Sequence, residues 1–202
     1  MKPFLKILIL LTLIPLYRMQ AQTVYTVSGD QTMTIQGTSN VHDWDEEVSK
    51  MYGEGAILPN ADGSFTISAL VIKIDIKDIK SSHGSIMDNK TYDALKSDKF
   101  PVITYKLLTP LTVKQSASGV SVTSKGQVTI AGVTKPLDLQ VKVTAKENGV
   151  LLFEGSKTLK MTDFGVSPPT AFMGAMKVGD DIVVTFKSSM QKKYTANTPL
   201  NN

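Results

Sequence analysis

Only two histidines in the chain could take part in acid–base or metal chemistry, His42 and His83. His42 lies in the polar segment 40–47 together with several carboxylates. Imidazole and carboxylate groups are common zinc ligands, so a metal site is one hypothesis for this segment. Such mixtures of polar residues are also usual in solvated loops, and we expect a loop here, with Trp44 packed against the rim of the fold.

His83 lies beside serines in the segment 81–85, a composition that a Ser–His–Asp triad would also use. The chain has no G-x-S-x-G elbow, P-loop, Rossmann glycine pattern or H-E-x-x-H motif. It also has no cysteine, which removes thiol nucleophiles, thiolate metal sites and disulfides. We therefore predict a protein that is not an enzyme, with no catalytic residue, no metal site and no cofactor.

The segment 162–176 is unusually apolar for a loop: it holds two Phe and two Met between Pro and Gly residues. Met side chains adapt to apolar partners, and large exposed apolar patches usually mark binding sites. A neighbouring helical pattern, with Met87, Tyr92 and Leu95, offers a second apolar surface. Two interpretations stay open: these segments bind an apolar ligand, or they close the ends of the fold as part of its core.

The elements that must position these residues are mostly strands. The clearest runs from Phe65 to Ile76, where Leu70, Ile72 and Ile74 alternate with more polar neighbours, a period-2 pattern typical of a strand with one buried face. Nine similar segments, separated by turn residues, cover 23–28, 33–39, 48–58, 102–108, 111–115, 120–130, 137–144, 150–161 and 182–187. Because short turns join several of these segments, we predict about eight strands in all.

One segment has the spacing of a short helix, near residues 85–97. Ser85 or Asp88 could cap its first turn, and the turn at 98–101 should end it. Many short antiparallel strands suit a barrel or a sandwich, and an eight-stranded barrel has room for packed side chains or for one small ligand. The strands and the helix therefore predict an all-β fold with one short helix, and the choice between a barrel and a sandwich stays open at this point.

The first 21 residues are typical of a secretory signal peptide. Lys2 and Lys6 precede or interrupt an apolar run that extends to Leu16, and Ala21 supplies a small residue for cleavage. The alternative is a retained anchor helix, although the run is short for a membrane span. Removing this segment lowers the net charge from +4 to +1, which disfavours nucleic-acid binding. The remaining chain predicts one domain at 22–192 and a flexible tail at 193–202.

Several motifs together resemble the YceI-like family of exported bacterial polyisoprenoid-binding proteins. They are GTSNVHDW at 37–44, MDNKTYDALK at 87–96 with FPVITY at 100–105, GQVTIAGVTKPL at 126–137, TDFG at 162–165 and VGDDI at 178–182. Their order and spacing agree over almost the whole chain beyond residue 21. The resemblance implies an eight-stranded antiparallel, lipocalin-like barrel with the helix near its mouth. It also implies a long isoprenoid or related amphipathic lipid in the lumen, and a periplasmic or secreted location.

Under this resemblance, one face of the strands lines the lumen and the apolar loop closes the mouth. The lumen candidates are Leu70, Ile72, Ile74, Ile103, Tyr105, Leu139, Val141, Val184 and Phe186, and the mouth candidates are Phe164, Phe172 and Met173. The expected partner is an isoprenoid or other long-chain lipid, without nucleic acid or stable membrane insertion; a homodimer is left open. Two other functions stay open: an enzyme acting on such a ligand through His83 or Tyr105, and an exported structural or adhesive β module without ligand.

Overall fold

The computed structural model describes residues 22–171 and 174–193. The predicted signal peptide, most of the predicted tail, and the two mouth candidates Phe172 and Met173 therefore lie outside the described residues.

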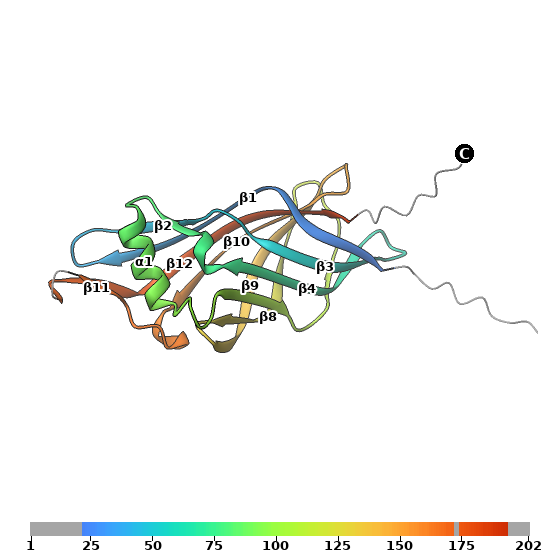
Figure 1. The fold of residues 1–202 in the computed structure, drawn as a ribbon. Helices are drawn as coiled ribbons and strands as arrows, with labels where there is room; N and C mark the ends of the chain where they lie inside the picture. Colours follow the sequence, from blue (N-terminus) through green and yellow to red (C-terminus); the bar gives the residue numbers. More distant parts are fainter. Residues whose placement is uncertain (1–21, 172–173, 194–202) are drawn as a thin grey trace, which may run out of the picture.

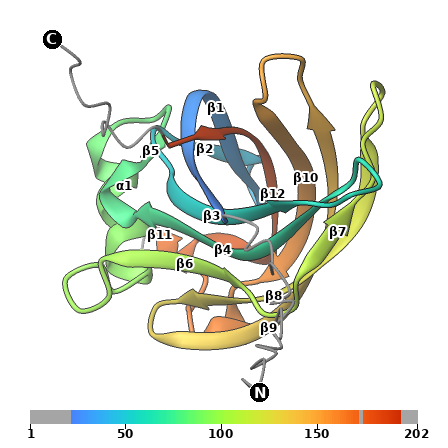
Figure 2. The ribbon, with the colours of Figure 1, turned by 90° about the vertical axis from the view of Figure 1, so that its right-hand side faces the viewer.

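Eight long strands form a closed antiparallel barrel (Figure 2). Each pairs with its neighbours in the order β12-β10-β9-β8-β6-β4-β3-β1, and β1 pairs again with β12 to close the ring. The predicted eight-stranded barrel is confirmed, and the β1–β12 pairing excludes the sandwich. The strands are β1 (Thr23–Ser39), β3 (Tyr52–Pro59), β4 (Phe65–Asp75), β6 (Val102–Leu107), β8 (Val120–Ile130), β9 (Val133–Ala145), β10 (Leu151–Lys160) and β12 (Met176–Lys192).

Short elements cluster mainly at one end of the barrel, which we call the helix end (Figure 1). The helix α1 (Ser85–Ala94) lies there, and the strand β2 (Trp44–Val48) pairs with both β1 and β5 (Ile79–Ser81). The remaining short elements are β7 (Leu111–Val113), β11 (Thr170–Ala171) and the 3-10 turns η1 (Ile76–Asp78) and η2 (Thr162–Phe164).

Strand boundaries differ from the sequence prediction at three places. The segments 23–28 and 33–39 form one strand, β1, because its pairing with β12 resumes after a register shift around Gly29, whose φ of +66° accommodates the irregularity. The predicted strand 48–58 is split into β2 and β3, and β2 takes in half of the predicted loop 40–47. The strand β12 begins at Met176, before the predicted residue 182, because it also pairs with β11.

The helix is shorter than predicted, and neither candidate residue caps it. Its N-cap is Gly84, with φ +84° and no side-chain hydrogen bond. The Asp88 carboxylate instead accepts a hydrogen bond from the backbone N–H of Ser81 (2.8 Å), so it anchors the preceding strand and not the first turn of the helix. The helix ends at Ala94, and Lys96 adopts a left-handed conformation with φ +55°.

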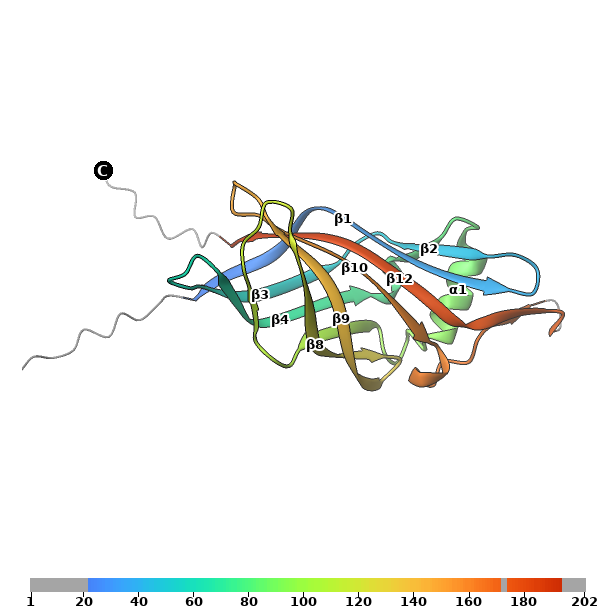
Figure 3. The ribbon, with the colours of Figure 1, turned by 180° about the vertical axis from the view of Figure 1, so that it is seen from behind.

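The largest buried cluster lies at the β3–β4 and β9–β10 hairpins, which are at the end of the barrel opposite α1 (Figures 1 and 3). Phe65, Val113, Leu151 and Met190 belong to this cluster. Two smaller clusters lie nearer the helix end, around Ile79 and around Phe164 in η2. The barrel is therefore filled with side chains at one end.

Candidate functional site: an apolar barrel cavity

A cavity of about 290 Å³ lies inside the barrel, between the packed end and the helix end. Every barrel strand except β3 contributes side chains to its wall, and most of them are apolar. On β3, Gly53 has no room for a larger side chain, because a Cβ there would lie 2.5 Å from Cδ1 of Ile72 and 2.9 Å from Cγ2 of Val27. The barrel thus encloses an apolar space of the size that small-molecule sites occupy.

The structure brings ten of the twelve predicted site residues together in this wall. The period-2 alternation that selected them places one face of each strand inside the barrel and the other face in solvent. Phe164 reaches the wall from η2, where it is buried beside Val166. The ten are Leu70, Ile72, Ile74, Ile103, Tyr105, Leu139, Val141, Phe164, Val184 and Phe186.

Sequence reasoning missed a second set of wall residues. The strand β1 contributes Met33 and Ile35, which alternate with Thr and Gln in the same period-2 pattern and could have been found by that signal. Most of the other missed residues lie within the predicted strand segments, and Met176, Val178 and Met190 lie outside them. The other missed residues include Met51, Ile67, Leu107, Val128, Val143, Phe153, Leu159, Met176, Val178, Ile182 and Met190.

The helix α1 covers part of the cavity with one face. Met87, Thr91, Ala94 and Leu95 all line the cavity, and their spacing matches one side of an α-helix. The opposite side, at Ile86, is 74% exposed. The helix therefore forms part of the cavity wall at the helix end.

Tyr92 fixes α1 to the barrel. Its hydroxyl accepts a hydrogen bond from Nζ of Lys80 (2.7 Å) and donates toward the carbonyl oxygens of Ile79 (3.0 Å) and Lys77 (3.2 Å). The Lys77 ammonium also lies 4.2 Å from the centre of the aromatic ring. One buried side chain thus joins the helix to η1 and β5 by hydrogen bonds and a cation–π contact.

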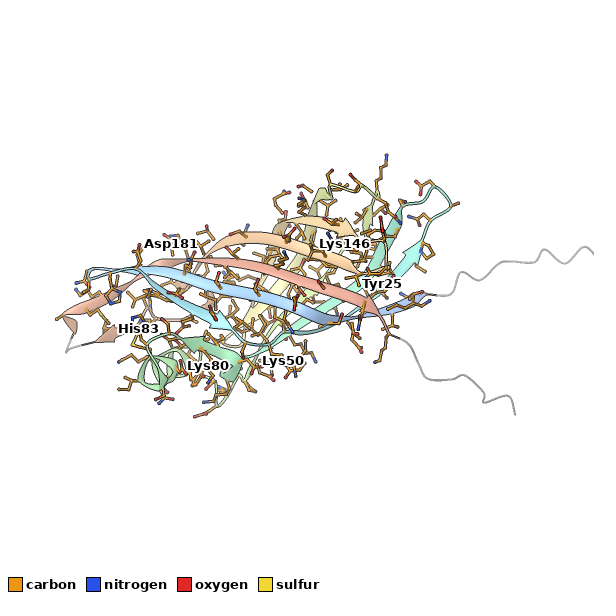
Figure 4. The ribbon with its side chains drawn as sticks, turned by 90° about the horizontal axis from the view of Figure 1, so that it is seen from above. Tyr25, Lys50, Lys80, His83, Lys146 and Asp181 are labelled. Atoms are coloured by element: carbon orange, nitrogen blue, oxygen red, sulfur yellow. The ribbon has the colours of Figure 1, made fainter. Side chains whose placement is uncertain are left out.

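Of the polar groups considered for catalysis, Tyr105 lines the cavity, whereas His83 does not, and Nδ1 of His83 shares a hydrogen bond with the hydroxyl of Ser82 (3.2 Å). Tyr105 shares a hydrogen bond with Ser124 (2.7 Å), and burial raises the pKa of the phenol, which keeps it protonated. His83 is exposed beside α1 (Figure 4). Its ring stacks on that of His42, with ring centres 6.0 Å apart. Within 22–171 and 174–193, no three His, Asp or Glu side chains gather closely enough to hold a metal ion.

Glu46 is the buried acid of the cavity wall. It projects from β2 toward α1, is 6% exposed, and accepts a hydrogen bond from the Thr91 hydroxyl at Oε1. Burial raises the pKa of its carboxyl, and the negative charges of Asp88 and Asp45 act in the same direction. Sequence reasoning placed this residue in a solvated loop; its burial depends on β2 pairing with β1 and on the helix that covers it.

The raised pKa of Glu46 makes a prediction about stability. The folded protein retains the Glu46 proton to higher pH than the unfolded chain, so this contribution to stability is present below the ordinary pKa of 4.5 and is lost as pH rises through the folded-state pKa. Glu46→Gln has no proton to lose at this position, so its stability does not decrease from this source as pH rises. We expect the variant to gain stability relative to the wild type as pH is raised from below 4.5 to neutral, in urea unfolding at several pH values. Glu47→Gln, on the exposed face of β2, is the matched control, and equal pH profiles for all three proteins would contradict this origin.

A closed antiparallel barrel with a helix over one end and an apolar cavity inside defines a lipocalin-like barrel. The chain belongs to the YceI-like domain family, whose family model matches residues 17–190. Among the described residues, no helix is long and apolar enough to cross a membrane.

A curated relative and two solved structures agree with this assignment. A UPF0312 protein of Pseudomonas paraeruginosa is 31% identical over 118 residues; the match spans 52% of this chain and 59% of that protein, less than two thirds of its length. The crystal structure of Burkholderia cenocepacia BcnA has a TM-score of 0.60 at 13% identity and covers 80% of this chain and 96% of that one. At this identity the likeness establishes the fold.

The second structure is a polyisoprenoid-binding domain from Saccharophagus degradans, implicated in plant cell wall breakdown. It has a TM-score of 0.60 at 12% identity, and the match covers 85% of this chain and 99% of that one. At this identity, too, the likeness establishes the fold.

Proposed function

We propose that the protein binds a long-chain amphipathic lipid of the isoprenoid type in the barrel cavity and sequesters or carries it. The observation that carries the proposal is the cavity itself, which is enclosed by the barrel strands, lined mostly by apolar side chains and covered in part by α1. A polyisoprenoid-binding domain with the same fold supports the choice of lipid.

The energetics of such a cavity favour a lipid over water. Apolar cavities in proteins stay dry and accept apolar guests, because water finds no hydrogen-bond partners on their walls. An apolar chain gains about 0.8 kcal/mol for each CH₂ group transferred from water. The barrel can offer this surface without exposing backbone groups, because its eight strands pair around a closed ring.

An exported location belongs to the same proposal. The predicted signal peptide ends at Ala21, and the first strand begins two residues later, at Thr23. The mature protein would then meet its lipid in the periplasm or outside the cell, where a lipid released from a membrane needs an apolar container in water.

The direct test is the lipid content of the protein as it is produced in its own cells. We expect native mass spectrometry to detect a bound species of lipid mass, and an organic extract of the purified protein to contain a long-chain lipid. The same spectrum reports whether the mature chain begins at Gln22. A protein that carries no lipid and, after purification, takes up no apolar fluorescent dye would overturn the proposal and favour a structural or adhesive β module.

A further inference from the structure

Glu46 differs from the other buried acid at the helix end. Asp88 uses both carboxylate oxygens: Oδ1 accepts from the Ser81 N–H, and Oδ2 lies 3.5 Å from the Lys80 ammonium. Glu46 lines the cavity, and only its Oε1 accepts a hydrogen bond, from Thr91. The described part of the chain supplies no hydrogen bond to Glu46 Oε2. Glu46 is 6% exposed and lines the cavity, and its Oε2 keeps some accessible surface while it accepts no hydrogen bond from the described residues.

The cations near this end of the cavity do not neutralise Glu46. Lys157 donates to the carbonyl oxygen of Asp138 (3.0 Å), and Lys160 pairs with the carboxylate of Asp181 (2.8 Å). Lys90 also lines the cavity, from α1, and is the cation that an anionic headgroup would use. The carboxylate of Glu46 opposes this attraction, because it would repel an anionic headgroup at close range.

We propose that Glu46 recognises the headgroup of the bound amphiphile by accepting a hydrogen bond from it, so that the ligand class is a long-chain isoprenoid with a donor headgroup, a hydroxyl or an amine. This inference rests on the proposed function, because it places the chain of the ligand in the barrel cavity. The donor would occupy the space beside Oε2, at the helix end, and the apolar chain would extend toward the packed end.

Two physical arguments support a donor over an anion. Oε2 keeps accessible surface, so water can solvate it before a ligand binds. A ligand that covers Oε2 without offering a donor leaves a buried acceptor without a partner, which is costly, whereas a ligand donor avoids that cost. Hydrogen bonds to an ionised group are also about twice as strong as those between neutral groups, so an amine gains most from Glu46. The negative charges of Asp45 and Asp88 already raise the pKa of the Glu46 carboxyl. A phosphate would add further negative charge beside these three acids.

The test compares four C20 isoprenoids with one chain and different ends: the hydrocarbon, the alcohol, the amine and the monophosphate. Trp44 is the only tryptophan of the chain and lines the cavity near Glu46, so its fluorescence reports binding, and displacement of an apolar dye gives a second measurement. We expect the wild-type protein to bind the amine and the alcohol at least about tenfold more tightly than the phosphate. In Glu46→Gln the preference for the amine over the hydrocarbon should fall about tenfold or more, and in Glu47→Gln it should not change.

The ratio of affinities within one variant cancels any difference in the folded fraction, so the test holds even if Glu46→Gln folds less well. A wild-type protein that binds the phosphate most tightly, with that affinity lost in Lys90→Gln, would overturn the inference. Equal amine-to-hydrocarbon affinity ratios in the wild type and Glu46→Gln would also overturn it. If the hydrocarbon and the dye still bind in that case, the proposed function stands. Failure of all four compounds and the dye to bind would overturn the proposed function, and this inference with it.

Discussion

The double variant Leu139→Trp/Val184→Trp should fold normally and lose its affinity for apolar ligands. Both residues line the cavity, from β9 and β12, and both are only partly buried because the space beside them is empty. Two indole rings placed there would occupy volume that the lipid chain otherwise takes. If they exclude about four CH₂ groups at about 0.8 kcal/mol each, the loss is about 3 kcal/mol. The affinity should then fall about 100-fold.

The expectation of normal folding has a physical basis. Larger side chains destabilise a core when they meet packed neighbours, at a cost of about 1–3 kcal/mol, but here they enter an existing cavity. We therefore expect the melting temperature of the lipid-free protein to stay the same or rise. Dye titration and thermal unfolding of one preparation measure both effects.

The matched control places the same side chains on the outer face. Gln140 and Val183 are the sequence neighbours of Leu139 and Val184, and both are exposed. Gln140→Trp/Val183→Trp should leave the affinity unchanged within a factor of two or so. Unaltered dye affinity in the cavity-facing double variant would show that the ligand does not lie between β9 and β12.

The alternation of apolar and polar residues made much of the cavity wall predictable. On β9, Leu139 and Val141 alternate with Asp138, Gln140 and Lys142, and a period of two residues assigns each to one side of a sheet whatever its neighbours are. The motif resemblance then selected the closed barrel over the sandwich, because alternation alone is common to both. The confirmed ring of eight strands supports both steps.

The unpredicted features depend on contacts between distant segments. Glu46 and Glu47 are adjacent acids in a polar stretch, and nothing local distinguishes them; β2 pairing with β1, and α1 covering one face, bury the first and expose the second. The predicted helix cap was wrong for a similar reason. Asp88 has the side chain of a capping residue, but its carboxylate accepts a hydrogen bond from the backbone N–H of Ser81, in β5.

Tyr92→Ala should be the most destabilising single substitution at the helix end. The side chain is 6% exposed and carries the hydrogen bonds that join α1 to Lys80 and the Ile79 carbonyl. Replacing a buried aromatic side chain by alanine costs about 3–5 kcal/mol. For a domain of this size, each kcal/mol lowers the melting temperature by about 2–4 °C, so a decrease of about 10 °C is expected.

The same substitution should affect ligand release, because α1 forms part of the cavity wall. With the Tyr92 contacts to η1 and β5 removed, the helix can open more often, so dye dissociation measured by stopped flow should be faster than in the wild type. Tyr92→Phe keeps the ring and removes the hydroxyl, and should cost about 1 kcal/mol. Ile86→Ala, on the exposed face of the same helix, should change stability by less than about 0.5 kcal/mol and leave dissociation unchanged. If Tyr92→Ala lowers stability but dye dissociation matches that of Ile86→Ala, then α1 supports the barrel without controlling access to its cavity.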